Sequence, residues 1–254
     1  MMYHPPAAGI EKAEWAGEAP RPVQAMTADG LALRGYVFGN SETARDVIVF
    51  YPGNADGPEG AAKMASPLAA TGAVVLSASY RGYGANPGRP TEAGLYKDGA
   101  AFLKLARQIA PSARVWLFGY SLGSAVALKT AENRAVPGVF TLGAFCRITH
   151  LTSKVLRAFV PDRFDNCGAA VRARVPIVAF HGTADEIVPL AEGELLRNAA
   201  PSFVQLVRLE GAPHRIALDP IAPPVARAMQ AISARTASSS PVSENRSPER
   251  DSDR

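Results

Sequence analysis

The chain has 254 residues, of which 47% are apolar and 20% are charged, and its formal net charge is +4. This is the composition of an ordinary globular protein, and the length suits one α/β domain with a sizeable core. The basic residues are scattered without a Lys/Arg-rich block, so we expect no nucleic-acid partner. No apolar run is as long as a membrane span and no signal peptide is evident, so we expect a cytoplasmic protein with no transmembrane segment.

Strand-like and helix-like patterns alternate along most of the chain. An Asp29-Gly30 turn joins the first two predicted strands into a hairpin, and a later continuous apolar run, residues 47–51, is typical of a strand buried on both faces. The predicted strands are residues 23–26, 31–38, 47–51, 74–77, 115–118, 139–142, 175–180 and 204–209. The predicted helices are residues 61–71, 91–109, 124–134, 190–199 and 220–234. This alternation predicts an α/β fold, with a mostly parallel sheet and helices on both faces.

Composition divides the chain into three parts. Residues 1–20 lack clear periodicity and are expected to form an extended lead-in, whereas residues 21–235 form the α/β domain. Residues 236–254 are almost free of apolar side chains, so we expect a disordered tail. Within the domain, residues 146–174 have an irregular helical pattern, which predicts a short cap or insertion.

The chain has two cysteines, Cys146 and Cys167. Two are too few for a disulfide framework, and their spacing is not that of metal ligands. We therefore expect buried or free thiols and no metal site, while a bridge between the two stays compatible with the sequence.

The most informative stretch is residues 119–123, which read G-x-S-x-G around Ser121. An apolar run precedes it and a helical pattern follows it, so the serine is predicted on a sharp turn between a strand and a helix. Glycine on both sides allows this turn, because bulkier side chains would clash with the neighbouring elements. The hydroxyl would lie at the amino end of a helix, where the backbone dipole favours negative charge. Ser121 is therefore the candidate nucleophile, and the alternative is a glycine-rich turn with no chemistry.

A serine hydroxyl needs a base within hydrogen-bond reach, and the base needs an acid that orients it. His214 is the candidate base, because its loop follows the last predicted strand and reaches the sheet edge where sites form in such folds. The alternative is a loop histidine that caps the final helix. The other histidines are less favourably placed, with His4 in the lead-in, His150 in the cap and His181 at a strand end.

Asp185 is the candidate acid, because it closely follows the predicted strand 175–180. The chain order Ser121, Asp185, His214 is also the order in which one group of serine hydrolases carries its triad. Glu186 is adjacent and Glu210 is a more distant alternative. The structural alternative for Asp185 is that its side chain caps the helix that begins near residue 189.

Acyl transfer also needs donors for the oxyanion of the tetrahedral intermediate. We expect one donor to be the backbone N–H of Leu122, directly after the nucleophile. The second is expected in the loop after strand 47–51, as the N–H of Asn54, with Gly53 allowing close approach. An ordinary turn after the strand is the alternative for this loop.

Several segments in the right order resemble a known family. They are Tyr51-Pro52-Gly53-Asn54-Ala55, Tyr80-Arg81-Gly82-Tyr83-Gly84, Gly119-Tyr120-Ser121-Leu122-Gly123 and residues 91–98, 164–166 and 181–189. Over residues 20–235 the chain resembles serine α/β-hydrolases related to the bacterial serine aminopeptidase and esterase families. The resemblance implies an α/β-hydrolase fold with the roles given above to Ser121, Asp185, His214, Asn54 and Leu122. The chain departs from the family pattern at residues 51–54, at Ser79 and at residues 211–214.

These features predict a serine hydrolase of small carboxylic esters or thioesters that forms an acyl-enzyme on Ser121 and needs no cofactor or metal. The cap would supply an acyl pocket unless its apolar side chains simply face the core; these are Leu151, Val155, Leu156, Phe159 and Val160. Two alternatives stay open. One is a peptidase that removes residues from peptide amino ends, which would need an acidic group for the substrate amine. The other is a binding protein that uses the same fold without turnover.

Overall fold

Strands and helices alternate along the part of the chain that the computed structural model describes, residues 3–6, 15, 19–132, 134–151 and 162–238. The strands are β1 (Arg21–Met26), β2 (Ala32–Phe38), β3 (Asp46–Tyr51), β4 (Val74–Ser77), β5 (Arg114–Tyr120), β6 (Val139–Leu142), β7 (Ile177–Gly182) and β8 (Val204–Leu209). The α-helices are α1 (Pro58–Ala65), α2 (Glu92–Ile109), α3 (Leu122–Ala131), α4 (Asn166–Ala173), α5 (Leu190–Ala199) and α6 (Ala222–Ser238). Two short 3₁₀-helices are η1 (Ser66–Thr71) and η2 (Ile148–Leu151).

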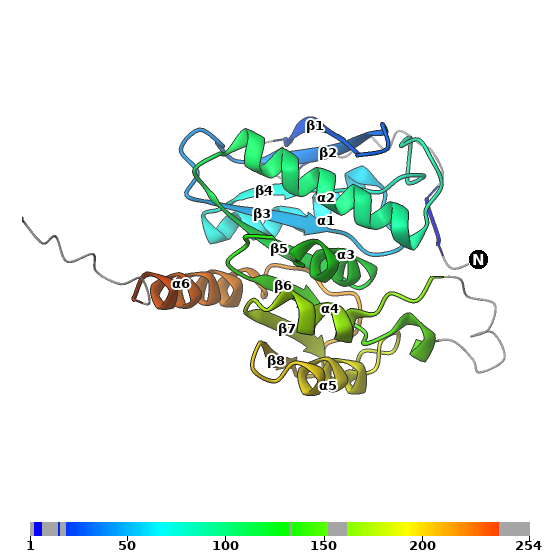
Figure 1. Ribbon diagram of the computed structural model, residues 1–254, viewed down its shortest axis with the longest axis vertical. Helices are drawn as coiled ribbons and strands as arrows, with labels where there is room; N and C mark the ends of the chain where they lie inside the picture. The colour runs from blue at the N-terminus through cyan, green and yellow to red at the C-terminus, as the bar shows by residue number, and fades with distance from the viewer. Residues whose placement is uncertain (1–2, 7–14, 16–18, 133, 152–161, 239–254) are drawn as a thin grey trace, which may run out of the picture.

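The strands form one sheet in the order β1-β2-β4-β3-β5-β6-β7-β8. β2 pairs antiparallel with both β1 and β4, and the other neighbouring strands pair in parallel. Figure 1 shows this order from the β1 edge to the β8 edge. The predicted hairpin and the mostly parallel sheet are therefore confirmed. Because β3 and β5 to β8 run in the same direction, the loops that follow them meet at one edge of the sheet.

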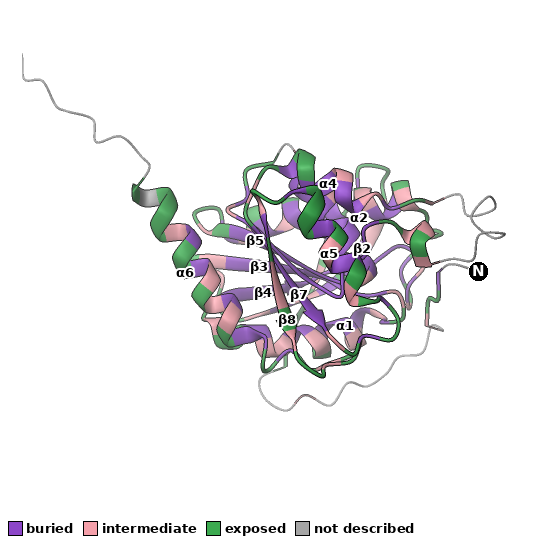
Figure 2. Cartoon of the chain, turned by 90° about the horizontal axis from the view of Figure 1, so that it is seen from below, coloured by how far each residue is buried: buried purple, intermediate pink, exposed green. Residues whose placement is uncertain are grey.

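The core lies on both faces of the sheet. Alternate residues of β3 belong to different apolar clusters: Val47 and Val49 pack with helices α2 to α5, whereas Ile48 and Phe50 pack with α1, η1 and α6. This period of two follows from the pleat, which sends successive side chains to opposite faces. Figure 2 shows the buried strands between the two layers of helices. The prediction of helices on both faces is thus correct.

Several element boundaries differ from those predicted. The helix expected over residues 61–71 begins earlier, at Pro58, and its second half is the 3₁₀-helix η1, because Pro67 has no N–H to continue an α-helical ladder. α6 continues to Ser238, into the first residues of the predicted tail, and residues 239–254 lie outside the described residues. Within the described ranges, no helix combines the length and apolarity needed to cross a membrane.

Cys146 and Cys167 form a disulfide, which corrects the expectation of free thiols. Cys146 follows β6, and Cys167 lies in the first turn of α4. The backbone N–H groups of Asn166 and Cys167 both donate to the carbonyl oxygen of Cys146, at 2.9 and 3.2 Å. These bonds bring the two Cα atoms to 4.9 Å, within the range of a disulfide. The bridge closes the predicted cap at its base.

Reducing this bridge is expected to lower the free energy of unfolding by about 3 kcal/mol, because a loop of this length then regains its freedom in the unfolded chain. The separation of 21 residues sets the size of the loop. Urea unfolding with and without a thiol reductant measures the difference. The double variant Cys146→Ala/Cys167→Ala is the control, and its unfolding should not respond to the reductant. Equal midpoints for oxidised and reduced wild type would contradict the prediction.

Candidate active site

Ser121 lies on a strained turn between β5 and α3. Its backbone has φ 50° and ψ −116°, a region that L-residues avoid and that costs about 1–3 kcal/mol. The turn is held on both sides, because the N–H of Ser121 donates to Leu142 at 2.8 Å and its carbonyl accepts from Ser124 at 2.9 Å. Strain of this kind gathers at functional sites, where the surrounding structure holds one side chain in an exposed position.

The structure brings the three predicted side chains into one hydrogen-bonded row. Nε2 of His214 lies 3.0 Å from Oγ of Ser121, and Nδ1 of His214 lies 2.8 Å from Oδ2 of Asp185. Ser121 follows β5, Asp185 follows β7 and His214 follows β8, so the parallel sheet delivers all three to one edge. The imidazole ring and the carboxylate are shielded from water, since Asp185 and His214 are each only 8% exposed. This is the relation of nucleophile, base and orienting acid.

Asp185 is held in its ionised form. Burial raises the pKa of its carboxyl, but the hydrogen bonds from His214, Val188 and Ile187 outweigh this, so the pKa lies below its usual value. The two backbone N–H groups donate to Oδ1 at 2.7 and 3.0 Å, which leaves Oδ2 for the imidazole. A carboxylate at Nδ1 requires a proton on that nitrogen, so Nε2 is free to accept the proton of the Ser121 hydroxyl.

The two alternative acids have other partners. Glu186 accepts the backbone N–H of His214 at 3.2 Å, and Glu210 accepts the hydroxyl of Thr183 at 3.4 Å. Neither of these bonds reaches the imidazole ring. Glu186 still contributes to the arrangement, because its carboxylate holds the backbone of His214.

The other three histidines lie in different environments. The ring of His181 donates to the carbonyl of Val188 at 2.8 Å, and its Nε2 also lies 3.6 Å from Oδ2 of Asp185, so this histidine steadies the loop that carries Asp185. The ring of His150 bonds to Glu192 at 3.0 Å. His4 contacts the loop after β3 through its backbone, described below. His214 is thus the histidine whose ring lies against Ser121.

The loop after β3 lies against Ser121. A Cβ atom added at Gly53 would lie 3.6 Å from Cβ of Ser121 and 3.0 Å from the ring of Tyr120, so a side chain there would crowd the site. Asn54 follows, and its Oδ1 accepts the hydroxyl of Tyr83 at 2.7 Å. Leu122 is the first residue of α3, where a backbone N–H has no acceptor within the helix. One predicted oxyanion donor, Asn54, therefore belongs to the loop after β3, which lies close to Ser121. The other, Leu122, directly follows Ser121 at the start of α3.

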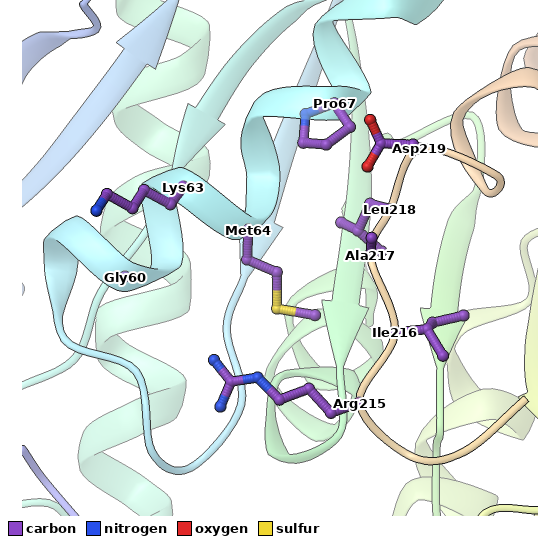
Figure 3. Close-up of a pocket in the computed structure, with 9 residues that line it drawn as sticks. All are labelled: Gly60, Lys63, Met64, Pro67, Arg215, Ile216, Ala217, Leu218 and Asp219. Carbon is purple, nitrogen blue, oxygen red and sulfur yellow. The ribbon is translucent and has the colours of Figure 1, made fainter. Parts of the chain in front are cut away.

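An ion pair links the two loops that flank the serine. Arg215, next to His214, bonds to the buried carboxylate of Asp56 at 3.1 Å. Figure 3 shows Arg215 at one end of a cavity of about 400 Å³ between α1 and the loop after β8, with Asp219 at the other end. Neither Asp56 nor Arg215 is part of a recognisable motif, so sequence reasoning missed this pair.

Part of the predicted cap lies outside the described residues. These include Val155, Leu156, Phe159 and Val160, which were expected to line an acyl pocket. Leu151, at the end of η2, packs against the main apolar cluster. Within the described ranges, no group of three or more His, Cys, Asp or Glu side chains could hold a metal ion.

Comparison with known proteins gives a family match and several related sequences. Residues 42–167 match the family described as serine aminopeptidase, S33. An uncharacterized protein of Mycobacterium tuberculosis is 32% identical over 223 residues, which cover 84% of this chain and 79% of that protein. The human α/β hydrolase domain-containing protein 17B is 32% identical over 146 residues, 55% of this chain and 50% of that protein.

Solved structures show the same fold at low sequence identity. The chain superposes on an esterase of Pyrococcus furiosus with a TM-score of 0.70 and 16% identity, over 92% of this chain and 97% of the esterase. Similarity at this level of sequence identity shows the fold alone. The chemistry has to be argued from the residues described above.

Proposed function

The chain belongs to the α/β-hydrolase group, and we propose that it is a serine hydrolase that cleaves carboxylic esters or thioesters. The observation that carries the proposal is the row of hydrogen bonds from Asp185 through His214 to Ser121, at 2.8 and 3.0 Å. The strained backbone of Ser121 is a second, independent support.

The reaction follows from the positions of these groups. Oγ of Ser121 attacks the acyl carbon while Nε2 of His214 takes its proton, and Asp185 stabilises the resulting imidazolium. The N–H groups of Leu122 and Asn54 stabilise the oxyanion of the tetrahedral intermediate. His214 then gives its proton to the leaving alcohol or thiol, which departs and leaves the acyl group on Ser121. Water, deprotonated by His214, attacks this acyl-enzyme; the bond between the acyl carbon and Oγ then breaks, and His214 returns its proton to Ser121 as the acid leaves. No cofactor takes part in these steps.

An ester or thioester fits the site better than a peptide amine. The described residues include four buried carboxylates: Asp56, Asp98, Asp185 and Glu192. Each already has a partner inside the protein. Glu192, at the base of the cap, accepts the N–H of Cys146 at 2.8 Å and bonds to the ring of His150. An aminopeptidase needs a carboxylate for the substrate amine, and at any of these four buried carboxylates that amine would have to displace an existing partner.

A fluorophosphonate probe tests the proposal on the purified wild-type protein. An activated serine is expected to react, and p-nitrophenyl esters and acyl thioesters of short and long chain length are then expected to be hydrolysed. Labelling with hydrolysis of aminoacyl amides alone would favour the peptidase. Absence of labelling in a folded protein would favour a binding protein.

The cytoplasmic location stays a prediction. The Cys146–Cys167 disulfide weighs against it, because disulfides are rare in the reducing cytosol. Cell fractionation with trapping of free thiols would decide both the location and the oxidation state.

A further inference from the structure

The segment of residues 3–6, called here the strap, is anchored at Tyr3. Tyr3 is buried, and its hydroxyl donates to Asp162 at 2.6 Å. Its ring packs edge-on against Phe164 with the centroids 6.5 Å apart. Asp162 also accepts the N–H of Glu92 at 3.0 Å, so the anchor reaches the start of α2. A lead-in without periodicity is thus fixed to Asp162 and Phe164, which lie within the predicted cap of residues 146–174.

From this anchor the strap reaches the loop that follows β3. The N–H of His4 donates to Oδ1 of Asn54 at 3.3 Å. Pro6 lies at the other end of the loop, where its ring is 3.2 Å from the position of a Cβ atom at Gly57. The strap therefore contacts the loop both at Asn54 and at the residue that precedes α1.

Asn54 is held from two directions. Oδ1 accepts the backbone N–H of His4 on one side and the hydroxyl of Tyr83 on the other, at 3.3 and 2.7 Å. Both bonds act on the side chain of the residue whose backbone N–H is the second oxyanion donor under the proposed function. An oxyanion donor is effective only when it is fixed before the charge develops.

We propose that the strap is a positioning element of the active site, in which the N–H of His4 and the hydroxyl of Tyr83 together fix the orientation of the Asn54 loop. The inference rests on the proposed function. Burial and the Asp162 carboxylate raise the pKa of Tyr3 above its usual value, so its hydroxyl remains a donor and the anchor holds under assay conditions.

The backbone donor is removed by His4→Pro, and His4→Ala is the matched control because it keeps the N–H while it removes the exposed ring. Loss of a whole oxyanion donor costs about 10²–10³ in kcat, so a loosened donor is expected to cost about tenfold, with little change in KM. Tyr83→Phe removes the second bond to the same acceptor and is expected to act in the same direction. The double variant should lose less than the product of the two single effects, because both act through Asn54.

Hydrogen exchange provides a readout that does not depend on activity. In His4→Pro, the peptide over residues 52–58 is expected to exchange faster than in wild type and in His4→Ala. Unchanged exchange with unchanged kcat, or fully multiplicative losses in the double variant, would overturn the strap's role. The exchange in His4→Pro could be faster while the wild-type protein hydrolyses no ester or thioester. That result would support the contact between strap and loop and would reject the proposed function instead.

Discussion

Ser121→Ala is expected to lower kcat/KM for ester hydrolysis by roughly 10⁴-fold or more and to abolish fluorophosphonate labelling, because the nucleophile itself is lost. The methyl group fits wherever the serine Cβ does, so the elbow should keep its shape. Esterase kinetics measure the loss, and circular dichroism shows whether the variant is folded.

The same loss is expected when the base is removed. His214→Ala should reduce kcat/KM about as far as Ser121→Ala, and the double variant should be little worse than either alone, because the two residues act as a unit. Asp185→Asn should cost about 10⁴-fold through the wrong imidazole tautomer. Substantial turnover by folded Ser121→Ala would mean that another group attacks the substrate and would reject the assigned roles.

Among the glycines that the structure describes, Gly123 is the one whose replacement by alanine is expected to be most damaging. A Cβ atom at this position would lie 2.0 Å from the carbonyl oxygen of Tyr51 and 2.6 Å from that of Pro52. Both contacts are with backbone of β3 and its loop, which cannot rotate away as a side chain could. We expect a loss of more than about 4 kcal/mol of unfolding free energy, or no folded protein.

Gly60→Ala is the matched control for this variant. Gly60 lies inside α1, and outside the helix's own backbone a Cβ atom there would come no closer than 3.7 Å, to Oδ1 of Asp56. Alanine is a better helix former than glycine by about 1 kcal/mol, so this variant should equal or exceed the stability of wild type. Urea unfolding of both variants compares the same chemical change at two positions. A Gly123→Ala protein as stable as wild type would show that β3 and α3 have room to separate.

The local sequence pattern was enough to predict the features that depend on the local backbone conformation. The sharp turn at Ser121, the hairpin at Asp29-Gly30 and the positions of Asp185 and His214 after strands all follow from residue types at short spacing. The choice of Asp185 over its neighbour Glu186 is different in kind. It depends on which carboxylate points at the imidazole, and the N–H groups of Ile187 and Val188 direct it.

Contacts between distant segments could not be predicted from the sequence. The bond from Tyr3 to Asp162 and the pair of Asp56 with Arg215 each join residues 159 positions apart. No periodicity or spacing rule connects such residues, because only the tertiary arrangement of the segments brings them together. The Cys146–Cys167 bridge was left open for a related reason, since the approach of its ends depends on the hydrogen bonds that hold the start of α4 against the backbone of Cys146.

That bridge also changes what a protease would do to the chain. A cut at any peptide bond between Cys146 and Cys167 produces two fragments that stay covalently joined, because the break falls inside the ring that the disulfide closes. The nicked protein would run as one band on a gel without reductant and as two bands with it. A cut in this segment would therefore leave Ser121 on one fragment and His214 on the other, with the disulfide joining the two fragments in a single molecule.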